Sequence, residues 1–246
     1  MIKFPVALKT NSLYLTMSYA IGSKTPVQIH TYLQHRLIKG ITFDRAKKGF
    51  KTADGTVYHG LHSMLRLYHY PNYVHSSRRS RTQKKGSSKL QGARVDEQLF
   101  EYIKSDYKKK PKHKMAVGIA LYLHENNQIP VAAQLPVFIQ KLQCITQADL
   151  IALDTKTNEL WVYEVKTGYP AGGFRKKGEL KGISGVGNTV YNHWELQRHY
   201  TVQGIEDNGL KVDRSAVLHV YMDTKKRKLE VKARKIPKWI KKWIQK

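Results

Sequence analysis

Cysteine and long apolar runs are both scarce in this sequence, and each shortage excludes a class of protein. Cys144 is the only cysteine among the 246 residues, which excludes an intramolecular disulfide framework, a four-cysteine iron–sulfur cluster and a cysteine-based zinc finger. We expect its thiol to be buried. No stretch of about 18 apolar residues occurs, so no transmembrane helix is expected. Residues Met1–Pro5 lack the basic-then-apolar layout of a secretory signal, so we expect an intracellular protein that is not secreted.

Acidic residues and nucleotide-binding glycine motifs are also scarce. The 18 acidic residues stand against 44 lysines and arginines, which gives a formal net charge of +26. This excess predicts a polyanionic partner, and nucleic acid is the first candidate because neutralised phosphates release counterions. A generally basic proteome and binding to a membrane surface are the alternative explanations. No GxGxxG or Walker sequence is present, so no ATP site is expected, and any motor activity belongs to a partner protein.

The pattern of predicted elements indicates an α/β fold with an N-terminal extension. Residues 1–85 are expected to form a basic N-terminal lobe, with a polar linker at about 76–89. Residues 86–246 form the main part, a mixed β-sheet flanked by helices, and end in a basic helix at 236–244 that packs on the body. Helices are expected at 27–33, from Gly92 to the lysines before Pro111, and from Thr189 through Tyr200. Strands are expected at 115–124, 131–139, 149–153, 160–166, 216–223 and 228–233.

The most informative feature is a predicted hairpin that carries acidic residues. Residues 149–153 and 160–166 have strand composition, and the segment between them has turn composition. A symmetric hairpin places Asp149 directly opposite Glu164, where two carboxylates repel each other. Lys166 lies on the same strand face as Glu164. A divalent cation between the acids, with the lysine directed at a reacting water or phosphate, explains this costly arrangement.

The same strands resemble the core of a known enzyme family. Residues 147–154, which lead with an aspartate, and 161–168, which end in acid-x-Lys-Thr-Gly, are similar to the motif strands of the PD-(D/E)xK nuclease superfamily. The closest resemblance is to its RecB-like and lambda-exonuclease-like branch, over about residues 92–203. The resemblance implies a restriction-endonuclease-like core.

The resemblance also implies roles for the hairpin residues. Asp149, Glu164 and the carbonyl of Val165 are expected to bind Mg²⁺ or Mn²⁺, and Lys166 is expected to position or deprotonate the attacking water. Independently of the family, hard oxygen ligands of this kind suit Mg²⁺. Asp154, a rival for the second acid, falls in the turn, where aspartates usually bond to local backbone, so we assign it a structural role.

Two further contributions are implied from helices. The family places an acid or histidine four residues after a glycine, and Asp96 stands in that position after Gly92 as a catalytic acid and metal ligand, with Glu97 as the alternative. Helical phase places Asp96 at the border of the buried face and Glu97 nearer the opposite side. An acid near the N-terminus of a helix, which the helix dipole favours, is the structural explanation of Asp96. The family's Gln-xxx-Tyr element is represented by Gln197 and Tyr200, one residue closer together but still on one helix face. Both are candidate catalytic residues, and core packing is the alternative for Tyr200.

Basic residues near these motifs are candidate contacts to a nucleic-acid backbone. Segment 174–182 is basic, contains glycine and follows the acid-x-Lys strand, so we expect a mobile loop that guides phosphates into the site. The candidate nucleic-acid-binding residues are Arg94, Arg175, Lys176, Lys177 and Lys181.

These features together predict a Mg²⁺-dependent deoxyribonuclease that hydrolyses phosphodiester bonds. We expect an exonuclease that acts in DNA recombination, repair or replication, located at DNA inside the cell. A structure-selective endonuclease that cuts junctions or flaps, and a catalytically silent basic DNA-binding protein, are the alternatives. DNA is the expected partner, together with a helicase or recombination protein, and assembly into a homo-oligomer stays open.

Overall fold

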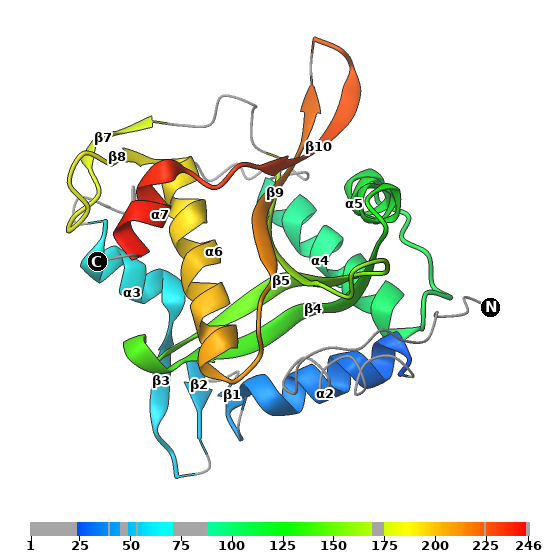
Figure 1. Ribbon diagram of the computed structural model, residues 1–246, viewed down its shortest axis with the longest axis horizontal. Coiled ribbons are helices and arrows are strands. Elements are labelled where there is room, and N and C mark those ends of the chain that lie inside the picture. The colour runs from blue at the N-terminus through cyan, green and yellow to red at the C-terminus, as the bar shows by residue number, and fades with distance from the viewer. Residues whose placement is uncertain are drawn as a thin grey trace.

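Helices cover both faces of one mixed sheet in the computed structural model (Figure 1). The structure describes residues 24–38, 40–44, 49–52, 54–70, 88–168, 175–223 and 225–244, without the side chains of 43, 44, 49, 88, 89, 175–177 and 244. The predicted α/β class, a mixed sheet flanked by helices, is confirmed. No helix in these ranges is both long and apolar enough to span a lipid bilayer.

The sheet combines parallel and antiparallel pairs. In spatial order its strands are β1, β2, β3, β5, β6, β9 and β10, and β4 also pairs with β5. The pairs β3–β5 and β6–β9 are parallel, and the other pairs are antiparallel. The strands are β1 (Thr42–Asp44), β2 (Gly49–Lys51), β3 (Val57–Gly60), β4 (Gln128–Ile139), β5 (Cys144–Asp154), β6 (Leu160–Thr167), β9 (Arg214–Asp223) and β10 (Lys228–Arg234).

Alternating side chains on the central strands bury two separate cores. Leu150 and Tyr163 point into a core closed by α4 and α5, whereas Ile151 and Val162 point into a core closed by α2 and α6. A third core joins α3, α7 and α6. The helices are α2 (Pro26–Ile38), α3 (Leu61–Tyr68), α4 (Ser88–Lys104), α5 (Lys114–Glu125), the 3₁₀ turn η1 (Gln140–Leu142), α6 (Val190–Asp207) and α7 (Lys238–Ile244).

Several predicted elements are confirmed by local hydrogen bonds and packing. The Thr189 hydroxyl accepts the N–H of Asn192 and caps α6 as expected. Helix α2 begins at Pro26, continues five residues beyond its predicted end, and has Thr25 and Gln28 in reciprocal capping contact. The strands at 131–139, 216–223 and 228–233 are present with small extensions as β4, β9 and β10. Cys144 is buried, and burial raises the pKa of its thiol to about 12.

The strand predicted at 115–124 is wrong, because these residues form helix α5. Its buried residues Met115, Ala116, Ile119 and Leu123 follow a helical repeat and pack in the core that α4 also closes. Residues outside that repeat are also apolar, so the segment has no clear polar face. For a short apolar run, periodicity alone cannot distinguish a buried strand from a buried helix. The main part of the chain therefore begins with two consecutive helices.

Helix α4 begins at Ser88 and ends at Lys104, so the start predicted at Gly92 is four residues late. Val95, Leu99 and Ile103, which recur at helical spacing, are in the core, each at most 1% exposed. Gly92 lies inside the helix, where an added Cβ would be 3.3 Å from Thr167 Oγ1. The missing side chain thus lets α4 approach the end of β6.

Segment 174–182, expected to be a loop, contains a strand over part of its length. Strand β7 (Arg175–Glu179) pairs antiparallel with β8 (Gly187–Thr189), and the two form a small separate sheet. Residues 169–174 and 71–87, with most of the predicted linker, lie outside the described residues. From the predicted N-terminal lobe, α2 packs against β4, and β3 extends the main sheet by pairing with β5.

Helix α7 packs on the body, as predicted for the C-terminal basic helix. Ile240 is fully buried, and Trp239 and Trp243 pack against the third core. The Trp239 indole N–H donates to Asn192 Oδ1 at 3.1 Å. Ile244 belongs to the helix, but its side chain lies outside the described atoms.

We predict that His30 makes the fold sensitive to mild acid. His30 on α2 is 3% exposed, its Nδ1 has no hydrogen-bond partner among the described residues, and its ring meets Phe100 edge-on at 5.5 Å. Burial, followed by the charge of Lys104, lowers the pKa of His30 to about 4. The unfolded chain binds this proton near pH 6.5, so the stability due to neutral His30 is complete above that pH and is lost as pH falls toward 4.

The measurement is the free energy of unfolding in urea at a series of pH values, for the parent and His30→Leu. The parent should lose up to about 1.4 kcal/mol per pH unit relative to the variant between pH 6 and pH 4. His124→Leu, on the exposed side of α5, is the control and should run parallel to the parent. A His30→Leu curve that also runs parallel to the parent contradicts the prediction.

Candidate active site

The hairpin of β5 and β6 has the predicted register. Leu150 pairs with Tyr163, and the pairing continues to Leu153 opposite Leu160 beside the turn. The regular pairing ends at Leu150 and Tyr163, one step short of Asp149 and Glu164, whose carboxyl groups interact through their side chains at the open end of the hairpin. The sequence therefore predicted which residues of the two strands are opposite each other.

The turn of this hairpin holds Asp154 in the structural role that was predicted. Asp154 Oδ1 accepts the backbone N–H groups of Lys156 at 2.8 Å and Thr157 at 2.9 Å. Asp154 is therefore at the closed end of the hairpin, whereas Asp149 is at the open end. The turn geometry therefore gives Asp154 a structural role and leaves Asp149 as the acid beside Glu164.

At Asp149 the backbone ladder is replaced by a side-chain hydrogen bond. Asp149 Oδ2 accepts the N–H of Val165 at 2.9 Å, which fixes the carboxyl group against β6. On the other side of β5, Gln134 of β4 stands opposite Asp149 between two regular pairs and has a φ of 50°. The Gln134 side-chain amide lies close enough to Asp149 to lower the pKa of that carboxyl group. Three neighbouring strands thus bring Gln134, Asp149 and Glu164 into one row.

Glu164 and Lys166 form a buried pair next to Asp149. Lys166 Nζ contacts Glu164 Oε1 and lies 3.9 Å from Asp149 Oδ2. The Glu164 side chain is 4% exposed and that of Lys166 is 18% exposed. Burial raises the pKa of both carboxyl groups, and the charge of Asp149 raises the pKa of Glu164 further. The Lys166 ammonium lowers both pKa values, but it is one positive charge against two acids.

Asp96 is brought from α4 into the electrostatic range of this pair. Burial, followed by repulsion from Asp149, raises the pKa of Asp96 to about 7, and Lys166 acts in the opposite direction. Glu97, the alternative helix acid, is exposed. The placement agrees with the helical phase that favoured Asp96, and it follows from the close approach of α4 to β6 at Gly92.

Tyr200 belongs to another cluster, whose members were not expected to surround it. Its hydroxyl lies 3.2 Å from His69 Nε2, and its ring packs against Trp243 of α7. Tyr200 is 7% exposed and packs in the third core, and a catalytic role for it stays a prediction. Gln197 is half-buried on the same helix. A contact between Gln197 and Lys166 stays a prediction.

Tyr70 is a site neighbour that the sequence did not indicate. It is 2% exposed, its ring stacks on His193 at 3.7 Å, and its hydroxyl donates to the His193 carbonyl at 3.5 Å. Burial raises the pKa of Tyr70, and the charges of Glu164 and then Tyr200 raise it further, so Tyr70 lies within electrostatic range of both residues. Gln134 was also missed, although a glutamine within an apolar strand was a visible signal.

The predicted backbone-binding residues are placed only in part. Arg94 and Lys181 are exposed, on α4 and after β7. Lys181 is held through its backbone, because its N–H donates to the His69 carbonyl at 3.1 Å. The side chains of Arg175, Lys176 and Lys177 lie outside the described atoms, so their contacts stay predictions.

The acids fit a divalent cation by their chemistry. Within the described ranges, no three His, Cys, Asp or Glu side chains are gathered closely enough to hold a metal ion by themselves. Asp149 and Glu164 offer a pair of hard oxygen ligands, and the nearby Asp96 is a third carboxyl group. Burial raises the pKa of all three, so their ionised forms are unfavourable without added positive charge. A divalent cation bound there would supply that charge.

Comparisons with protein-family models, with curated proteins and with solved structures find no match.

Proposed function

We propose that this chain is a Mg²⁺-dependent deoxyribonuclease with a restriction-endonuclease-like core. The observation that carries the proposal is the cluster of Asp149, Glu164 and Lys166 at the open end of one hairpin. Asp96 adds a third acid from a helix, and the chain carries a net charge of +26 that favours a polyanionic substrate. A cluster of buried acids with one lysine has little value for stability alone.

Each residue has a distinct task in this proposal. The Val165 N–H orients Asp149, and Asp149 and Glu164 hold Mg²⁺ or Mn²⁺ with Asp96 and the Val165 carbonyl as further ligands. A cation bound there would activate water and neutralise charge on the phosphate. Lys166 as an ammonium would position the attacking water beside the scissile phosphate, or as a neutral amine would take its proton. Gln197 is a candidate contact to Lys166 or to DNA.

An exonuclease is the favoured form of this activity, in DNA recombination, repair or replication. Such an enzyme works on DNA ends, with a helicase or recombination protein as a partner, since no ATP-binding motif is present. A structure-selective endonuclease with the same residues is the alternative. The two forms differ in whether they need a free DNA end.

The test is a nuclease assay on end-labelled linear, nicked and covalently closed circular DNA, with Mg²⁺ titrated from zero in a chelator. We expect degradation of linear DNA that rises with Mg²⁺ and no cleavage of closed circles. Cleavage of closed circles or of junctions favours the endonuclease hypothesis over the exonuclease hypothesis. Equal activity with and without chelator, or no activity on any DNA while binding persists, contradicts the proposal.

A further inference from the structure

The sheet continues past the acid cluster into a basic hairpin, β9–β10. Lys166 pairs in register with His219 of β9, and His219 pairs with Lys232 of β10. Two residues earlier on β6, Glu164 pairs with Val217 of β9, and Val217 pairs with Arg234 of β10. Residues in one row of a sheet point to the same face, so Lys232 and Arg234 share the face of the acid cluster.

These basic side chains border a shallow hollow of about 440 Å³ on that face. Its floor contains the rings of His219 and Tyr221, which lie 4.6 Å apart and are almost fully buried. Arg234 stacks on the Tyr191 ring at 3.6 Å, which orients its guanidinium group. The N–H donors of a guanidinium lie in its plane, so Arg234 donates hydrogen bonds in that plane and not through its stacked face. The lining residues are His219, Tyr221, Lys232, Ala233, Arg234 and Lys235.

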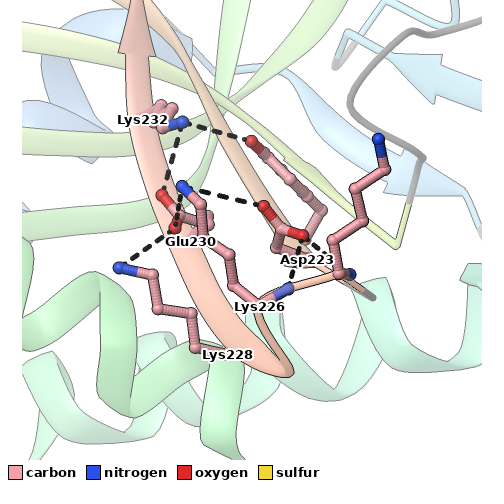
Figure 2. Close-up of polar contacts among 7 residues, drawn as sticks. Asp223, Lys226, Lys228, Glu230 and Lys232 are labelled. Carbon is pink, nitrogen blue, oxygen red and sulfur yellow. Dashed lines mark hydrogen bonds and ion pairs between the residues drawn. The ribbon is translucent and has the colours of Figure 1, made fainter.

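The acids nearby do not neutralise this surface. Glu230 is approached by three lysines at once, Lys226 at 3.6 Å, Lys228 at 3.2 Å and Lys232 at 3.3 Å (Figure 2). From Asp223 to Lys235 the chain has seven basic and two acidic residues. Glu195 is within electrostatic range of Arg234, but it is already paired with Arg198 at 2.8 Å. The hairpin therefore presents an excess of positive charge to any ligand on this face.

We propose that this hollow binds a DNA phosphate a few nucleotides from the bond that is cut, with Lys232 and Arg234 as its main contacts. The inference rests on the proposed nuclease function, because it uses the acid cluster as the site of cleavage. Two strand spacings separate Lys232 from Lys166, about 10 Å, and a DNA strand with one phosphate per about 3.4 Å of duplex axis covers that distance in a few nucleotides. The buried rings provide a rigid floor, and the charged groups bind the backbone without reading sequence.

The test compares two double variants with equal loss of charge. K232Q/R234Q removes the proposed contacts, and K108Q/K110Q removes two exposed lysines that follow α4, the helix on the opposite face. Binding of a fluorescent DNA oligonucleotide is measured in chelator over a range of salt concentrations, so that cleavage is not needed. K232Q/R234Q should weaken binding by about tenfold and reduce the slope of log affinity against log salt by about 1 to 2, whereas K108Q/K110Q should change neither substantially.

K232R/R234K, which keeps the charge, should restore the salt dependence of binding. A thermal unfolding midpoint of K232Q/R234Q equal to that of the parent shows that the glutamine variant is folded. In Mg²⁺, K232Q/R234Q should raise KM for DNA and leave kcat nearly unchanged, since the contact lies away from the reacting bond. Equal effects of the two glutamine variants on affinity and salt slope overturn the proposed phosphate site. If the parent does not cut DNA but the variants still differ in binding, the nuclease function fails and the phosphate site stands.

Discussion

Lys166→Ala is expected to lower Mg²⁺-dependent DNA cleavage by on the order of a thousandfold, with little change in DNA affinity. The physical reason is the position of Lys166 Nζ, which contacts Glu164 and lies 3.9 Å from Asp149 Oδ2. A group at this point can reach a water held by the same acids, but it is one of 44 basic residues that attract DNA. Cleavage rate and binding should therefore separate.

Single-turnover cleavage and binding in chelator measure the two effects of this substitution. Lys109→Ala is the matched control, since Lys109 also pairs with a glutamate, Glu101 at 2.6 Å, but on the exposed surface. Lys166→Arg adds a stricter test, because it keeps the charge but does not accept a proton at working pH. Cleavage by Lys166→Ala at the rate of the Lys109→Ala protein removes Lys166 from the catalytic machinery.

Asp149→Asn is expected to abolish cleavage and, at the same time, to stabilise the metal-free protein at neutral pH. Burial raises the pKa of Asp149, so its charged form is unfavourable in the folded state without a cation. Asparagine keeps an oxygen that can accept the Val165 N–H, but it has no charge to repel Glu164. Loss of activity with a gain in stability is typical of residues kept for function.

Thermal unfolding with and without Mg²⁺ measures this second prediction. Metal at about 100 times its dissociation constant should stabilise the parent by about 2.7 kcal/mol, and it should have little effect on Asp149→Asn. Asp154→Asn is the control, because Asp154 bonds to the backbone of the turn and should leave the response to metal unchanged. A parent that gains no stability from Mg²⁺ or Mn²⁺, or an Asp149→Asn protein that gains as much as the parent, contradicts the assignment of Asp149 as a ligand.

Much of the candidate site could be predicted because its parts are close together along the chain. The hairpin and its register depend on two strands, one turn and the alternation of side chains, all within residues 149–166. The role of Asp154 and the cap at Thr189 are equally local, since each bonds to backbone two or three residues away. Asp96 could be predicted because helical phase places it toward the buried side of its helix.

Helix α5 shows where such local patterns fail. Its residues Met115–Leu123 are apolar enough to suit either a helix or a strand in a core, and the packing with α4 decides between them. Tyr200 shows the same limit for a motif. The spacing from Gln197 is compatible with a shared helix face, but His69 and Trp243, distant in the chain, place Tyr200 in another cluster.

The sequence by itself determined the hairpin that places Asp149 opposite Glu164, the lysine beside them and the overall basic charge, because nearest neighbours and strand alternation dictate these features. Only the tertiary structure decided what surrounds them. The pairing of β4 with β5 puts Gln134 across from Asp149, and packing in the third core brings Tyr70 within electrostatic range of Glu164. The parallel pairing of β6 with β9 and the pairing of β9 with β10 align Lys166 with Lys232. These contacts join residues that are far apart in the chain. They form only when the strands pair into the sheet and the helices cover its two faces.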